Sequence, residues 1–137
     1  MCPGRETALA RKVLLVNPNQ MKPPVAPLAL DYLASALSEN GFEVDLLDLC
    51  FCQNPEDFTA EIDRYFALKS VFAIAITLRN TDDTCFTTQD FFIPRVKETI
   101  DSIRAHSSAP LIMGGSGFST MPEAILQYCN LDMGIWG

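Results

Sequence analysis

The stretch Val71-Phe-Ala-Ile-Ala-Ile-Thr77 is a short apolar run in which β-branched residues recur. A strand with one face in water alternates apolar and polar residues, and this run does not. It therefore predicts a strand that is buried on both faces. Strands of that kind occur in parallel sheets that carry helices on both sides.

The segments on either side of this run alternate between strand-like and helix-like patterns. Further strands are expected at 12–16, 44–49, 110–113 and 131–135. Helices are expected at 28–40, from 54 or 55 to 68, at about 90–106 and at 122–129. Pro94 is tolerated only in a first turn, which favours a start of the third helix nearer Ile93. Such alternation predicts an α/β fold with a parallel sheet. For 137 residues, enough for one domain, we expect a flavodoxin-like (Rossmann-like) three-layer sandwich, five strands in the order 2-1-3-4-5.

Composition excludes several classes of function. The net charge is −7 with only 10 Lys and Arg, so the chain is a poor candidate for binding nucleic acid phosphates. No apolar stretch is long enough to span a membrane, and the N-terminus lacks a signal peptide's apolar core. The five scattered cysteines favour reduced thiols and a cytoplasmic location. Residues 1–11 are expected to be a flexible leader and 12–137 the domain.

In this fold, ligands bind beyond the carboxyl ends of the strands. The loop after the third strand, Thr77-Leu-Arg-Asn-Thr-Asp-Asp-Thr84, is rich in hydrogen-bonding groups. Arg79 offers five donors, and Asn80 offers both donors and acceptors. A solvated loop with local side-chain turns explains the same composition. Composition therefore leaves ligand contact and a solvated loop both open.

The loop after the fourth strand contains three of the chain's seven glycines, within Leu111-Ile-Met-Gly-Gly-Ser-Gly-Phe-Ser119. Gly114 and Gly115 remove two Cβ atoms from the wall of the expected crevice, so a flat ring could lie against bare backbone there. The polar edge of the ring would then meet main-chain groups and Ser116 or Ser119. The loop lacks a P-loop lysine and is not a dinucleotide-binding G-x-G-x-x-G. A phosphate-accepting receiver domain is also excluded, because no carboxylate stands at Asn17 or Thr77.

Five motifs follow one another along the chain: K-V-L-L-V-N-P at 12–18, P-L-A-L-D-Y-L-A-S-A-L-S-E-N-G-F-E-V-D-L-L-D-L at 27–49, I-T-L-R-N-T-D-D at 76–83, G-G-S-G-F-S-T-M-P-E at 114–123 and D-M-G-I-W-G at 132–137. Together they make the chain, from about residue 12 to 137, resemble the N-terminal cobalamin-binding domain of cobalamin-dependent radical SAM enzymes. The resemblance implies a domain that binds cobalamin with its dimethylbenzimidazole tail away from cobalt and inserted into the sheet crevice.

The resemblance also implies which residues contact the cofactor. A hydroxyl residue after the third strand and a Gly-Gly pair after the fourth flank the tail in that family, and Thr77 and Gly114-Gly115 match them. By position, Asn17, Arg79 and Asn80 are expected near the corrin or its lower face. The full expected set is Asn17, Thr77, Leu78, Arg79, Asn80, Gly114, Gly115, Ser116 and Gly117. No catalytic residue and no metal-ligating side chain is expected.

One departure concerns the cobalt ligand. Methionine-synthase-like cobalamin domains carry D-x-H-x-x-G after the first strand, and its histidine ligates cobalt. Here that loop reads Asn17-Pro-Asn-Gln-Met-Lys-Pro-Pro24, and His106 is the only histidine of the chain. The resemblance therefore implies base-off cobalamin without a histidine ligand. Arg79 is expected at the lower face, where a cation would disfavour a further ligand and favour cob(I)alamin.

A second departure concerns the rest of the enzyme. The radical SAM cluster motif C-x-x-x-C-x-x-C is absent from the chain. The resemblance thus implies a fragment whose partner is its own C-terminal radical SAM domain, which would hold the 4Fe–4S cluster and S-adenosylmethionine of a methyltransferase. Alone, the fragment would not be an enzyme. Two alternatives stay open: a flavodoxin-like domain for another flat cofactor or nucleotide, and a regulatory interaction domain.

Overall fold

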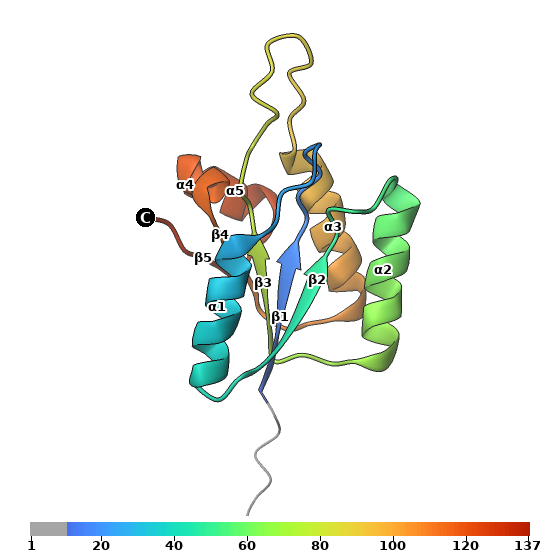
Figure 1. Cartoon of the computed structure of the whole chain (residues 1–137), viewed down its shortest axis with the longest axis vertical. Helices are drawn as coiled ribbons and strands as arrows, with labels where there is room; N and C mark the ends of the chain where they lie inside the picture. Colours follow the sequence, from blue (N-terminus) through green and yellow to red (C-terminus); the bar gives the residue numbers. More distant parts are fainter. Residues whose placement is uncertain (1–10) are drawn as a thin grey trace, which may run out of the picture.

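The computed structural model describes residues 11–137. It contains a five-stranded parallel sheet in the order β2-β1-β3-β4-β5, which confirms the predicted topology (Figure 1). The strands are β1 (Lys12–Asn17), β2 (Glu43–Asp48), β3 (Ala73–Thr77), β4 (Leu111–Gly114) and β5 (Met133–Gly134). Apart from Arg11, the leader expected at residues 1–11 lies outside the described residues.

Five helices connect the strands: α1 (Leu28–Glu39), α2 (Pro55–Leu68), α3 (Ile93–His106), α4 (Ser116–Thr120) and α5 (Pro122–Tyr128). Local sequence explains where two of them begin and end. Asn54 caps α2, because its side chain accepts a hydrogen bond of 2.9 Å from the Asp57 N–H. Gly41 follows the end of α1 with a φ of +82°, the left-handed conformation expected for a residue after a helix.

The core consists of two layers separated by the sheet. The larger layer joins one face of the central strands to α2, α3 and α5, and Leu14, Ile74 and Ile76 lie in it. The smaller layer lies on the opposite face, where Val13 and Leu15 pack under α1. Successive residues of β1 thus point into opposite layers and are buried on both sides, as expected for a central parallel strand.

Two elements differ from the sequence-based expectation. Residues 116–120 were expected to be loop, yet they form the one-turn helix α4. Ser, Gly and Thr are weak helix formers, so this turn depends on contacts with the loop after β3 rather than on propensity. Strand β5 has two residues instead of the five expected at 131–135. The remaining bounds agree within one residue, except that β3 begins two residues later than expected. Helix α3 begins at Ile93, where the position of Pro94 favoured its start.

The loop between β3 and α3 projects beyond the carboxyl edge of the sheet (Figure 1). An isolated antiparallel bridge between Asp82 and Phe91 closes its base. The Asp83 carboxylate accepts hydrogen bonds from the N–H groups of Cys85 and Asp90, so this loop, residues 78–92 and called the arm below, is internally ordered. Within the described part of the chain, no helix combines the length and the apolar character required to cross a membrane.

Candidate functional site

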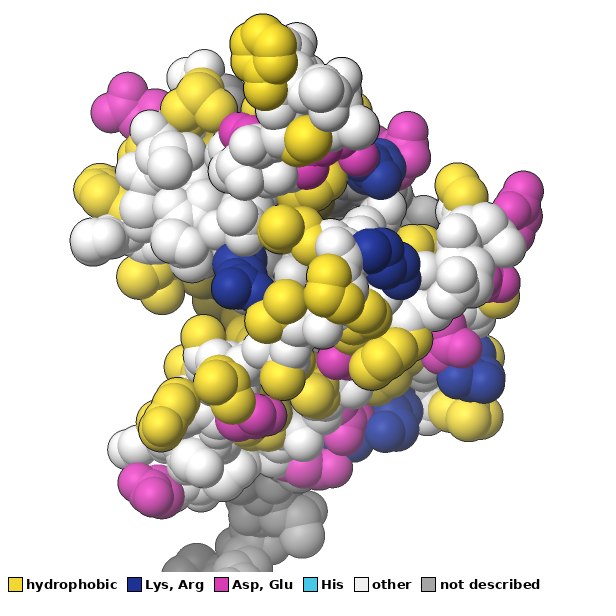
Figure 2. Space-filling view, turned by 45° about the horizontal axis from the view of Figure 1, so that its top comes forward, with side chains coloured by type: hydrophobic (Ala, Val, Ile, Leu, Met, Phe, Trp, Pro, Cys, Tyr) yellow, Lys and Arg dark blue, Asp and Glu magenta, His cyan; other side chains and the backbone are white. Residues whose placement is uncertain are grey.

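A pocket of about 340 Å³ opens at the carboxyl edge of the sheet, between the start of α1 and the loops after β3 and β4. Figure 2 shows the molecular surface hollowed on its left side, with a basic side chain in the hollow. The pocket brings together five of the predicted site residues. Its walls are formed by Asn17, Asn19, Val25, Ala26, Pro27, Leu28, Ala29, Leu30, Thr77, Arg79, Gly115 and Ser116.

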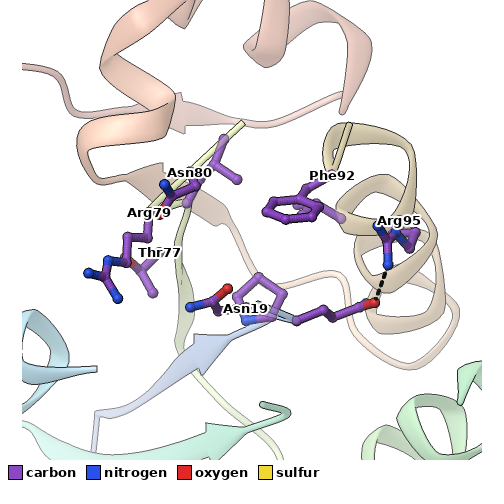
Figure 3. Close-up of a pocket in the computed structure, with 10 residues that line it drawn as sticks. Asn19, Thr77, Arg79, Asn80, Phe92 and Arg95 are labelled. Atoms are coloured by element: carbon purple, nitrogen blue, oxygen red, sulfur yellow. Dashed lines mark hydrogen bonds between the residues drawn. The ribbon is translucent and has the colours of Figure 1, made fainter. Parts of the chain in front are cut away.

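Thr77 and Arg79 line this pocket and also a second, smaller space on the other side of the loop (Figure 3). Thr77 is half-buried at the end of β3, and Arg79 is exposed. Within residues 11–137, neither the Thr77 hydroxyl nor the Arg79 guanidinium has a hydrogen-bond or ion-pair partner in the protein. Both groups are therefore available to a ligand without first breaking a bond.

Asn80 contributes an unsatisfied acceptor. Its side-chain oxygen is buried and has no hydrogen-bond partner among the described residues. A buried acceptor without a donor costs about 1–3 kcal/mol, so such atoms are rare in folded proteins unless a bound group completes them. Asn80 also lines the smaller space, whose volume of about 10 Å³ is roughly that of one water molecule.

The loop after β3 is held against the start of α4 by hydrogen bonds. The Leu78 N–H donates to the Gly114 carbonyl at 2.8 Å, and the Leu78 carbonyl accepts from the Gly117 N–H at 2.9 Å. The Ser116 hydroxyl donates to the Arg79 carbonyl at 2.8 Å. The Leu78 side chain is only 3% exposed, so this residue adjoins the site through its backbone.

The same contacts give a further reason for the clustered glycines, and a ring against Gly114 and Gly115 stays a prediction. A Cβ atom on Gly115 would lie 2.6 Å from the Leu78 carbonyl oxygen, and a Cβ atom on Gly117 would lie 2.9 Å from the backbone nitrogen of Asn80. The backbone that passes so close is therefore the chain's own loop after β3. Gly114 differs, because its added Cβ would meet its nearest atom at an ordinary 3.4 Å.

Asn17 lines the pocket but uses its amide within the protein. It is 2% exposed, its Nδ2 donates to Asp48 at 2.8 Å, and its Oδ1 accepts from the Asn19 N–H at 3.2 Å. Asn17 thus ties the end of β1 to the end of β2 and shapes the loop that follows. Contact between Asn17 and a cofactor stays a prediction.

Comparison with known proteins identifies the family. The B12 binding domain family matches residues 17–137, which is most of the chain. The chain belongs to the B12-binding domain family. The pocket at the carboxyl edge of the sheet thus belongs to a domain whose family is named after vitamin B12.

Individual relatives of this B12-binding domain are much longer than the chain. It is 41% identical over 125 residues to tryptophan 2-C-methyltransferase of Streptomyces laurentii, covering 91% of the chain and 20% of the relative. The structure of the radical S-adenosylmethionine methyltransferase TsrM from Kitasatospora setae, with cobalamin and a 4Fe–4S cluster bound, superposes with a TM-score of 0.87 at 42% identity. That match covers 93% of this chain and 22% of TsrM. The chain thus spans about a fifth of these relatives.

Two further solved structures resemble the chain, one at high and one at low sequence identity. TsrM from the same organism with tryptophan and the S-adenosylmethionine analogue aza-SAM gives a TM-score of 0.86 at 43% identity, over 91% of this chain and 23% of that one. The receiver domain of the response regulator TorR gives 0.54 at 11% identity, over 92% of this chain and 82% of that one. The receiver likeness shows the fold alone.

The single histidine of this B12-binding domain lies far from the pocket. His106 is the last residue of α3, where its Nε2 lies 2.7 Å from the Asp63 carboxylate and its ring stacks on Phe66. A helix that connects parallel strands runs antiparallel to them, so its C-terminus lies at the amino edge of the sheet. Among residues 11–137, no three His, Cys, Asp or Glu side chains come together as metal ligands.

The cysteines near the carboxyl edge differ in their chemistry. Burial, followed by the neighbouring Asp48 carboxylate, raises the pKa of Cys50 to about 11, so this thiol stays protonated. Cys85 is exposed on the arm, and hydrogen bonds from Thr87 and Thr88 lower the pKa of its thiol to about 7. The described cysteines, Cys50, Cys52, Cys85 and Cys129, are all free thiols.

Sequence reasoning missed one wall of the pocket and most of the smaller space. The proline-rich loop before α1 and the first turn of that helix supply the apolar wall, from Val25 to Leu30. Their position after β1 was the available signal, because ligand loops follow strands at this edge. Phe92 and Arg95 also line the smaller space, but nothing in the sequence around them indicates that they lie near the site. Arg95 reaches the site by donating to the Gln20 side chain at 3.0 Å, across 75 residues of sequence (Figure 3).

Proposed function

We propose that this chain is the cobalamin-binding module of a radical SAM methyltransferase and binds cobalamin base-off, without a histidine ligand. The observation that carries the proposal is the pocket at the carboxyl edge of the sheet of a B12-binding domain, where Thr77 and Arg79 present polar groups that have no partner among residues 11–137. The domain that performs this role is residues 12–137.

The residues present fit such a cofactor. One wall of the pocket is apolar, from Val25 to Leu30, and the opposite wall is formed by Thr77 and the backbone of Gly115. Burial of roughly 200–300 Å² of an aromatic tail in such a slot would contribute about 5–8 kcal/mol before the costs of association. The unsatisfied oxygen of Asn80 lies outside this pocket, because Asn80 lines the smaller space instead.

Each polar residue has a distinct task in this proposal. Thr77 directs its hydroxyl to a ring nitrogen of the tail, since a hydroxyl can donate to such a nitrogen. Arg79 places its cationic guanidinium near the lower face of cobalt, where it disfavours a further ligand. The backbones of Leu78, Gly114 and Gly117 keep these two side chains in place through the hydrogen bonds described above. When bound, cobalamin supplies a cobalt centre that can carry a methyl group.

The remaining chemistry belongs to a larger protein. The relatives of which this chain spans about a fifth are named as methyltransferases, and one was solved with cobalamin and a 4Fe–4S cluster. By this proposal the domain works with its own C-terminal radical SAM domain, which holds the cluster and S-adenosylmethionine, in the cytoplasm. Neither nucleic acid nor membrane is a partner.

Cobalamin retention tests this proposal directly. The purified chain is incubated with hydroxocobalamin, passed through a desalting column and examined by absorbance. We expect a retained corrin band with a base-off spectrum, lost or weakened in Thr77→Val. The control His106→Gln should retain the same band and spectrum, because that histidine lies at the opposite edge. Corrin that elutes after the protein in the small-molecule fraction, flavin that elutes with the protein, or a base-on spectrum would reject the proposal.

A further inference from the structure

We propose that Ser116 is a positioning residue whose hydroxyl sets the direction in which Arg79 enters the pocket. The inference deepens the proposed function and rests on it for the identity of the ligand. Ser116 was expected to contact the cofactor from sequence. Its hydroxyl instead donates to the Arg79 carbonyl at 2.8 Å, a partner 37 residues earlier in the chain.

The local geometry explains why the Ser116 hydroxyl reaches across to another loop. Ser116 is the first residue of α4, and the preceding Gly115 has a φ of +108°, which turns the chain sharply as it leaves β4. No side chain caps α4. The hydroxyl at position 116 therefore does not serve its own helix and is directed to the loop after β3.

The bond to Arg79 completes a set of constraints on that loop. Backbone groups fix Leu78, through its N–H to Gly114 and its carbonyl to Gly117. The next carbonyl, that of Arg79, is held by Ser116 alone among the described residues. The Arg79 side chain makes no hydrogen bond of its own in the described structure, so the direction of its guanidinium depends on how its backbone is held.

Ser119 provides a matched control on the same helix. Its hydroxyl also donates to a backbone carbonyl, that of Gly115, at 3.1 Å. That bond lies within α4 and does not touch the loop after β3. Ser119→Ala therefore removes a bond of the same kind from the same short helix without releasing Arg79. Ser116→Thr keeps the hydroxyl and serves as the conservative rescue.

The first measurement uses the ligand-free chain. Hydrogen exchange of the Gly117 amide, which donates to the Leu78 carbonyl at 2.9 Å, reports whether the loop and α4 stay together. Loss of one ordinary hydrogen bond corresponds to a change of about 2- to 12-fold in the local opening equilibrium. We expect exchange faster by that factor in Ser116→Ala, and wild-type exchange in Ser116→Thr and Ser119→Ala.

The second measurement couples Ser116 to Arg79. Equilibrium dialysis gives the dissociation constant for hydroxocobalamin of Ser116→Ala, Arg79→Ala and the double variant, with bound spectra recorded in parallel. If Ser116 acts through Arg79, Ser116→Ala weakens binding about 2- to 12-fold, and the double variant binds no more weakly than Arg79→Ala alone. The spectrum of cobalamin bound to Ser116→Ala should also shift toward the spectrum of cobalamin bound to Arg79→Ala.

Two results would overturn the inference. If the effects of the two single substitutions multiply in the double variant, Ser116 acts on the ligand independently of Arg79. If Gly117 exchange in Ser116→Ala equals that in Ser119→Ala, the hydroxyl does not hold the loop. A wild-type chain that retains no corrin would refute the proposed function instead, and the exchange measurement would still decide whether Ser116 holds the loop.

Discussion

Replacement of Gly115 by alanine probes the junction between β4 and α4 most directly. Gly115 has a φ of +108° and a ψ of 166°, a backbone region that is almost restricted to glycine, where another residue costs about 1–3 kcal/mol. The added Cβ would also lie 2.6 Å from the Leu78 carbonyl oxygen, a rigid backbone atom. Moving that carbonyl weakens its bond from the Gly117 N–H, which contributes about 0.5–1.5 kcal/mol. Together these terms predict a loss of about 2–4 kcal/mol.

Urea unfolding of Gly115→Ala measures this loss, and Gly41→Ala separates its two causes. Gly41 also has a positive φ, +82°, but an added Cβ there would meet no atom within 4 Å. Gly41→Ala should therefore lower the free energy of unfolding only by the cost of a positive φ for alanine, about 1–2 kcal/mol. A loss for Gly115→Ala no larger than that for Gly41→Ala would refute the close contact between Gly115 and the loop after β3.

Three further predictions concern other parts of the chain. Asn54→Ala should lower the free energy of unfolding by about 1 kcal/mol, measured in urea, because it removes the cap of α2; no change would contradict the cap. Hydrogen bonds from the Leu111 N–H, the larger cause, and from the Arg104 guanidinium lower the pKa of Asp132 below its ordinary 3.8. The ionised carboxylate therefore stabilises the fold above pH 3.8, and this stabilisation is lost as the pH falls through the lowered pKa. Asp132→Asn should thus be less stable than wild type at pH 7, and the difference should shrink as the pH falls below 3.8, by thermal unfolding; a pH-independent difference would contradict this. Alkylation of Cys85 by iodoacetamide should show a midpoint at about pH 7, and a midpoint of 9 would show that its thiolate is not stabilised.

The sheet could be predicted from sequence because its signals are local. An apolar run such as 71–77 favours a strand buried on both faces, and the alternation of such runs with helical patterns leaves few topologies. In the structure Ala73, Ile74 and Ile76 are buried, while Phe72, before the strand, is exposed. The actual strand begins at Ala73, since strand ends depend on which neighbours are present to pair. The short helix α4 was missed and β5 was expected to be longer than it is, because the extent of both depends on partners distant in sequence rather than on local pattern.

The site could be predicted only in part. The positions of Thr77 and Arg79 at the carboxyl edge follow from strand order alone, and the structure places both at the pocket. The roles of the glycines could not be derived in the same way. A glycine in sequence indicates that something passes close to the backbone, but it does not say whether that is a ligand or another part of the chain.

The close approach at Gly115 and Gly117 links the fold to the proposed function. Because both lack a side chain, the loop after β3 lies directly against α4, and its backbone groups bond to Gly114 and Gly117. A loop held in this way carries Arg79 to the pocket beside Thr77, and among residues 11–137 neither polar side chain has a partner. Binding then costs less conformational entropy, since the residues that meet the ligand are already ordered. The glycines thus contribute to ligand binding by fixing the loop, even where no ligand atom touches them.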